Sequence, residues 1–100
     1  MMIKLTVDPE KEKSVYNFEK NEVTIGSKFS SYADLRLSTE FLEDVHVKIS
    51  RKPDGCFIYN TTNDPFTTVN DQPFGKLTIK NGDLIQIRNT VLFFELLKDE

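Results

Sequence analysis

The sequence predicts an all-β fold, an antiparallel β-sandwich of about ten or eleven short strands. The first observation is period-two alternation, as in Ile3, Leu5 and Val7, which share one face of an extended segment. The second is that turn-forming residues recur about every eight to twelve positions. The third is that helical periodicity is scarce, with residues 39–43 as the only short candidate.

Alternation defines the strands of the first half of the chain, and polar segments separate them. Residues 8–12 contain a proline and turn the chain back, and a Lys20-Asn21 turn follows the second strand. Gly26 is expected to break the third strand before a polar loop over residues 27–33. The expected strands here are residues 3–7, 14–18, 23–25, 35–37 and 45–49.

Turn chemistry defines the strands of the second half. Pro53 and Gly55 predict a hairpin, because proline fixes one φ and glycine accepts a positive one. Asn70-Asp71 predicts a tight turn before residues 72–73, and Asn81-Gly82 predicts another. The expected strands here are residues 56–60, 67–69, 76–79, 84–87 and 90–97.

Length and composition indicate one ordinary globular domain over residues 1–100, with 38% hydrophobic and 29% charged residues. The net charge is −3 and no basic run is present, so nucleic-acid binding has little support. No apolar run approaches the roughly twenty residues of a membrane span, and the N-terminus lacks a secretory apolar core. A single cysteine, Cys56, fits a reducing compartment and a buried thiol, so we expect a cytoplasmic location. Because the sequence stops directly after a strand, we expect a segment of a longer protein.

Five short motifs follow one another in a fixed order between residues 23 and 87. They are Val23-Thr24-Ile25-Gly26, Asp34-Leu35-Arg36-Leu37, His46 with its alternating strand, Val69-Asn70-Asp71, and Asn81-Gly82-Asp83-Leu84-Ile85-Gln86-Ile87. This order resembles the forkhead-associated (FHA) domain, a β-sandwich that reads phosphothreonine. The resemblance covers about residues 3–96 and implies the FHA topology. It also implies that Gly26 and His46 brace the binding loops.

The phosphate-binding positions of that family are altered here. The family has Arg after the glycine and a Ser-Arg pair before the histidine, and this sequence has Ser27, Glu43 and Asp44 there. The family pattern Ser-x-Asn-Gly-Thr falls on residues 63–67, where Asn63 could still donate but Pro65 and Phe66 replace Asn and Gly. A dianion needs converging cations and hydroxyls. The only cation counted over these loops is Lys28, against four acids, which are Glu40, Glu43, Asp44 and Asp64.

The loop aromatics Phe29, Tyr32, Phe41 and Phe66 lie outside the strand pattern, and they fit equally well as core beneath the loops or as an exposed apolar contact patch. We name Lys28, Phe29, Phe41, Asp64 and Phe66 as candidate contact-loop residues. The three acids at residues 40, 43 and 44 lack the spacing of a calcium loop, so we expect no metal. One His and one Cys give no readable catalytic set, so we expect no enzyme activity and no cofactor.

The sequence therefore predicts a non-catalytic protein-interaction module that does not depend on phosphate. Within the family it most resembles the cytoplasmic domains of type III secretion inner-membrane ring proteins, which also have Gly-Ser for Gly-Arg and a Val-His without the Ser-Arg pair. That resemblance implies neighbouring copies and secretion components as partners. The alternative is a phosphothreonine reader with a relocated pocket built on Lys28, Ser30, Ser31 and Asn63.

Overall fold

The computed structural model describes residues 2–11 and 13–98, so Met1, Glu12, Asp99 and Glu100 of the expected 1–100 domain lie outside the described residues. Eleven strands are present in the described part. They are β1 (Met2–Val7), β2 (Ser14–Phe18), β3 (Glu22–Ser27), β4 (Leu35–Leu37), β5 (Val47–Lys52), β6 (Gly55–Asn60), β7 (Thr67–Val69), β8 (Gln72–Pro73), β9 (Lys76–Thr78), β10 (Leu84–Ile87) and β11 (Thr90–Leu97). The predicted all-β fold is confirmed, and no described helix is long and apolar enough to cross a membrane.

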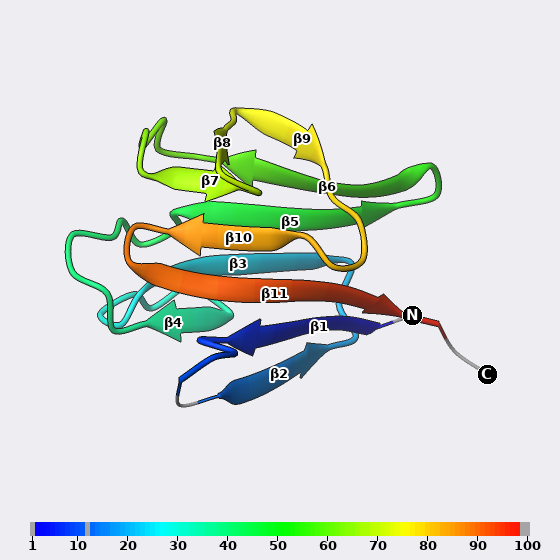
Figure 1. The fold of residues 1–100 in the computed structure, drawn as a ribbon, viewed down its shortest axis with the longest axis horizontal. Helices are drawn as coiled ribbons and strands as arrows, with labels where there is room; N and C mark the ends of the chain where they lie inside the picture. The colour runs from blue at the N-terminus through cyan, green and yellow to red at the C-terminus, as the bar shows by residue number, and fades with distance from the viewer. Residues whose placement is uncertain (1, 12, 99–100) are drawn as a thin grey trace.

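The strands form two sheets that pack face to face (Figure 1). One sheet has the order β2-β1-β11-β10-β7-β8 and the other β4-β3-β5-β6-β9. The strand pairs are antiparallel except for β3 and β4, which run parallel at one edge of the second sheet. Asp34 explains the exception, because its carboxylate accepts from the Thr24 backbone N–H (2.9 Å) and its own N–H donates to the Thr24 hydroxyl (3.0 Å). These contacts hold the start of β4 beside β3.

The core lies between the two inward faces and follows the period-two pattern. Side chains from both sheets are completely buried there, among them Leu5, Ile25, Ile58 and Phe94. Cys56 joins them at 3% exposure, and burial raises the pKa of its thiol, so it packs as a small neutral apolar group.

Two of the boundary differences from the sequence expectation concern the point where the chain crosses from the β4–β5 loop onto β3. Gly26 does not end its strand, because β3 continues to Ser27, and β5 begins at Val47 rather than Val45. The His46 N–H donates to the Ile25 carbonyl (2.8 Å), so the segment before β5 already lies against the end of β3. The Asn70-Asp71 turn forms as expected, with φ of 49° and 67° between paired Val69 and Gln72.

The long loops gather at one end of the sandwich. The β3–β4, β4–β5 and β6–β7 loops and the β10–β11 hairpin lie at the left of Figure 1, and the start of β1 and the end of β11 lie at the right. This arrangement brings residues 27–34, 38–46 and 61–66 together, although they are far apart in sequence.

Candidate functional site

Gly26 allows the β4–β5 loop to lie directly on the end of β3. A Cβ atom on Gly26 would stand 1.9 Å from the Asp44 carbonyl oxygen and 2.9 Å from the Glu43 carbonyl oxygen. The Ser27 N–H donates to that Glu43 carbonyl (3.0 Å). The glycine is therefore required by close backbone approach, and its φ is not positive.

His46 joins two loops from beneath. Its side chain is 2% exposed, and its Nδ1 lies 3.2 Å from the Glu43 backbone N–H, which donates to it. Because Nδ1 is an acceptor, the proton of the neutral ring belongs on Nε2, which donates to the Asp64 carboxylate at 3.0 Å. The β4–β5 loop and the β6–β7 loop are thus linked through one imidazole, which is the contact pattern expected of a bracing histidine.

Asp64 is the centre of a buried polar cluster. The Phe66 N–H (3.1 Å) and the Thr67 hydroxyl (3.0 Å) donate to its carboxylate, and Arg88 Nε lies 3.3 Å away. Burial alone would raise the pKa of Asp64, but hydrogen bonds from Phe66, His46 and Thr67 and the charge of Arg88 outweigh it, so the pKa is lowered. Asp64 is only 7% exposed. Its assignment to an exposed contact surface is therefore wrong, because its carboxylate is used internally.

The positions that would grip a phosphate hold no free cation. The Ser27 hydroxyl accepts from the Phe29 N–H (3.1 Å), and the Glu43 and Asp44 side chains are exposed at the loop surface. Asn63 is exposed with a φ of 60°. Lys28 places its Nζ over the Phe29 ring, 5.1 Å from the centroid. Two exposed carboxylates, those of Glu43 and Asp44, therefore lie at this part of the loop surface.

One of the four residues of the alternative, relocated phosphothreonine pocket is not accessible. Ser30 is 2% exposed, and its hydroxyl accepts from the Tyr32 and Ala33 N–H groups, each at 3.0 Å. This hydroxyl shapes the β3–β4 loop and does not face solvent. Ser31 and Lys28 remain exposed.

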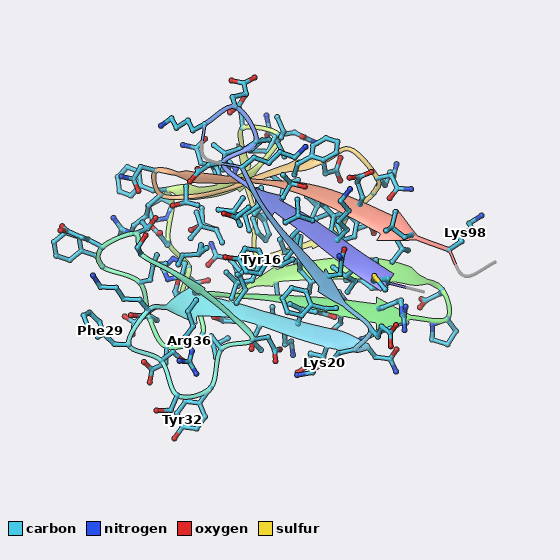
Figure 2. The ribbon with its side chains drawn as sticks, turned by 90° about the horizontal axis from the view of Figure 1, so that it is seen from below. Tyr16, Lys20, Phe29, Tyr32, Arg36 and Lys98 are labelled. Carbon is cyan, nitrogen blue, oxygen red and sulfur yellow. The ribbon has the colours of Figure 1, made fainter. Side chains whose placement is uncertain are left out.

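The structure settles the position of the loop aromatics, because all four are exposed. Phe29 is 83% exposed, Tyr32 76%, Phe41 82% and Phe66 64%. Figure 2 shows Phe29 and Tyr32 projecting outward from the β3–β4 loop. Phe41 has a φ of 64°, a left-handed conformation that is rare for a residue with a large side chain. These rings are therefore exposed apolar side chains and not additional core.

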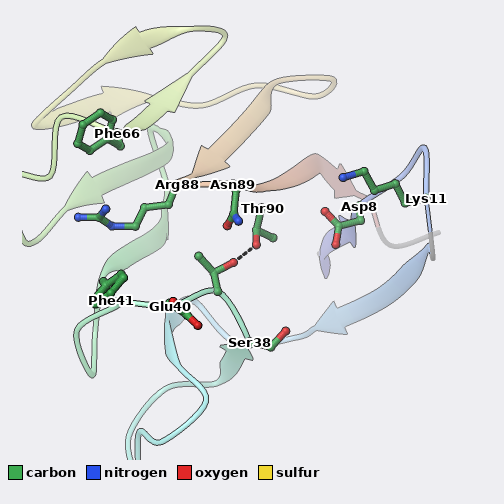
Figure 3. A pocket seen from close by; sticks show the side chains of 10 residues that line it. Asp8, Lys11, Ser38, Glu40, Phe41, Phe66, Arg88, Asn89 and Thr90 are labelled. Atoms are coloured by element: carbon green, nitrogen blue, oxygen red, sulfur yellow. Dashed lines mark hydrogen bonds between the residues drawn. The ribbon is translucent and has the colours of Figure 1, made fainter.

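An open groove of about 670 Å³ adjoins Phe41 and Phe66 (Figure 3). Arg88 lines it, 5.5 Å from the Phe66 ring centroid, with a φ of 56° in the tight β10–β11 turn. The hydroxyls of Thr39 and Thr90 share a hydrogen bond that ties the β4–β5 loop to this turn. Sequence reasoning missed Arg88, whose only signal was the Arg88-Asn89 turn between two strands.

Within residues 2–11 and 13–98, no three His, Cys, Asp or Glu side chains gather in a way that could hold a metal ion. The described surface instead offers exposed rings beside acids.

Comparison with known proteins places this geometry in a family. The model of the FHA domain matches residues 23–88. No curated protein matches the sequence.

Three solved structures illustrate the shared fold. The FHA domain of CT664 protein from Chlamydia trachomatis has a TM-score of 0.81 and 16% identity, covering 98% of this chain and 100% of that one. Mycobacterium tuberculosis EmbR, in complex with a low affinity phosphopeptide, has a TM-score of 0.83 and 16% identity, covering 99% of this chain and 25% of EmbR. The FhaA FHA domain, complexed with the intracellular domain of Rv3910, has a TM-score of 0.77 and 20% identity, covering 92% and 98%.

Proposed function

Because the chain belongs to the forkhead-associated domain family, a family of protein-interaction modules that often bind phosphothreonine peptides, we propose that it binds a protein partner without reading phosphate. In this proposal the domain is non-catalytic and works as a scaffold or assembly unit. Its loops, braced by Gly26 and His46, supply the contact surface.

The observation that carries the proposal is the charge at the three phosphate-binding positions. They hold Ser27, whose hydroxyl is engaged by the Phe29 N–H, and the exposed acids Glu43 and Asp44. The repulsion between a phosphate and one carboxylate about 6 Å away costs roughly 3 kcal/mol per pair of unit charges at an effective dielectric near 20. Two such acids offset one or two good charge-assisted hydrogen bonds.

The exposed aromatics indicate where a partner would make contact. Phe41 and Phe66 stand on either side of Arg88 at the mouth of the groove, and Phe29 projects from the neighbouring loop. Aromatic and arginine side chains are enriched among the residues that dominate binding energy in protein interfaces. The end of the sandwich that carries the loops therefore combines exposed aromatic side chains, which could anchor a partner, with acidic residues around them.

The wider setting we propose is the cytoplasm, as part of an inner-membrane ring component of a type III secretion system. The support is the resemblance of Gly26-Ser27 and Val45-His46 to that branch of the family. Neighbouring copies of the same chain, or other components of the apparatus, would be the partners.

The alternative of a relocated phosphothreonine pocket has less support, because Ser30 is buried and its hydroxyl already accepts two backbone N–H groups. Lys28, Ser31 and Asn63 remain exposed, but together they supply only one cation for a dianion.

The proposal is tested by isothermal titration calorimetry. The domain is titrated with a phosphothreonine peptide library and, in parallel, with the same peptides in unphosphorylated form. We expect no gain in affinity from phosphate. The matched variant S27R/E43S/D44R shifts the local charge by +4 and shows whether restored cations recover phosphate binding on the same fold. A phosphate-dependent Kd below about 50 μM for the wild type, roughly −6 kcal/mol, would contradict the proposal.

A further inference from the structure

The outer face of β5, β6 and β9 carries a cluster of lysines packed against two aromatic rings. Lys48 Nζ lies 5.0 Å from the Tyr59 centroid, and Lys76 Nζ lies 5.2 Å from that of Phe57 and 5.6 Å from that of Tyr59. Lys52 Nζ lies 5.8 and 5.9 Å from the same two rings. We refer to these five residues as the lysine–aromatic face.

Strand geometry produces this face. Phe57 and Tyr59 point outward because Cys56 and Ile58 fill the core, and Tyr59 is paired with Lys48 on one side and Lys76 on the other. The rings hold the lysine stems in place through cation–π contacts, which reduces the entropy that a partner must remove on binding.

The positive charge of the lysine–aromatic face is mostly uncompensated. Glu22 lies 3.8 Å from Lys48, but Lys52 and Lys76 make no ion pair with any residue of the described part of the chain. This occurs in a domain with a net charge of −3. The face is therefore a local positive surface on an acidic molecule, suited to an acidic partner.

The β4–β5 loop presents the complementary surface. Glu40, Glu43 and Asp44 are all exposed, and none forms an ion pair with another described residue. Phe41 projects among them at 82% exposure. The Thr39–Thr90 hydroxyl contact and backbone hydrogen bonds to β3 anchor the loop, so the backbone that carries its acids and ring is held in place.

We propose that the acidic β4–β5 loop of one copy docks on the lysine–aromatic face of a second copy. Three carboxylates meet three ammonium groups, and Phe41 meets the rings of Phe57 and Tyr59. The inference rests on the proposed assembly function and names its partner. The two surfaces are different patches of the same chain. Used in one direction the contact is heterologous, and its repetition builds a closed ring or an open chain of copies; used reciprocally about a twofold axis it closes a dimer.

Sedimentation velocity and light scattering over a concentration series test this. The wild type is expected to exceed the monomer mass as concentration rises at low salt, and to return toward the monomer at about 0.5 M salt, because screening weakens charge pairing between exposed groups. The face variant K52E/K76E and the loop variant E40K/E43K should each remain monomeric, since like charges then meet. The matched control K80E/K98E, with the same charge change at exposed lysines elsewhere, should associate like the wild type.

Variants that exchange the charges across the contact provide the decisive test. A mixture of the face and loop variants should associate again, and so should the fourfold variant K52E/K76E/E40K/E43K, because opposite charges are restored across the contact. As a second probe, F41A is expected to weaken association about tenfold or more without changing its salt dependence.

A wild type that stays monomeric up to about 1 mM would overturn the inference, and this holds even if a variant fails to fold. Association that survives both single-surface variants, or is not restored in the mixture, would also overturn it. Binding of the wild-type monomer to anionic vesicles through Lys52 and Lys76 would assign the face to a lipid surface instead. None of these results changes the phosphopeptide titration, so failure of the self-contact and failure of the phosphate-independent function remain distinguishable.

Discussion

Replacing Asp64 by Ala should strongly destabilise the domain. The substitution removes the acceptor of the His46 Nε2–H at 3.0 Å and of the Thr67 hydroxyl at 3.0 Å, and these two donors are 2% and 0% exposed. Each buried group without a partner costs about 1–3 kcal/mol. Arg88 also loses its carboxylate, although its partly exposed guanidinium can turn to water. We expect a total loss of about 3–5 kcal/mol at pH 7.

Asp64→Asn retains the shape and one acceptor oxygen. If that oxygen faces His46 and Thr67, the amide NH₂ faces the Phe66 N–H, which donates to the carboxylate in the wild type at 3.1 Å. Two donors then oppose each other, and the expected loss is smaller, about 1–3 kcal/mol. The free energy of unfolding should therefore fall in the order wild type, Asp64→Asn, Asp64→Ala. The size of each step shows how much of the stability comes from the carboxylate charge and how much from its acceptor oxygens.

Urea unfolding at pH 7, followed by circular dichroism, measures both losses. Asp44→Ala is the matched control, because it removes an exposed carboxylate from the adjoining loop and should change stability by less than about 0.5 kcal/mol. If Asp64→Ala lowers the free energy of unfolding by less than about 1 kcal/mol, the buried cluster does not hold the loops and the reasoning is refuted.

The remaining predictions concern backbone approach and pH. Gly26→Ala should cost about 3 kcal/mol or more, because the new Cβ would meet the Asp44 carbonyl at 1.9 Å, whereas Gly75→Ala, with nothing within 4 Å, should be nearly neutral in the same urea assay. Folding lowers the pKa of Asp34 and Asp64 from 3.8, since hydrogen bonds outweigh burial in both. Their stabilisation is therefore fully present above about pH 4 and is lost as the pH falls through the folded values, which thermal unfolding from pH 7 to pH 2 would show as a steep decline that is shallower in Asp64→Asn.

Local patterns were sufficient for most strands and hairpins. The alternating strands β1, β3, β6 and β11 each bury one face, whereas β2 and β9 have no buried side chain. Which face of a strand a side chain occupies depends only on the strand's own period-two sequence. The Asn70-Asp71 turn follows from residues that tolerate positive φ, and both adopt it. These features need no knowledge of the rest of the chain.

Features that depend on distant partners could not be read from the sequence. Asp64 looked like one more surface acid, and its burial depends on His46, eighteen positions earlier, and on Arg88 in another hairpin. The parallel pairing of β4 depends on Asp34 bonding to Thr24, ten positions away. In each case a charged side chain is placed by contacts that the local pattern does not contain.

Exposure of the loop aromatics was equally undetermined, because core and contact surface require the same residue types. The lysine–aromatic face did leave a signal. Phe57 and Tyr59 occupy the outward phase of a strand whose inward phase is already apolar, and Lys48 and Lys52 share the outward phase of the preceding strand. That Lys76 lies beside them depends on the register in which β9 pairs with β6, and this register cannot be predicted from the sequence pattern.

The pairing of Met2 with Leu97 has a practical consequence for how the domain is displayed. Both ends of the described chain leave at the pole opposite the loops (Figure 1). A fluorophore, a resin linker or a fused domain attached at either end would therefore extend away from Phe41 and the groove. Domains immobilised by either end would present their loops outward in one orientation, so a sensor surface made this way would report loop binding without blocking it.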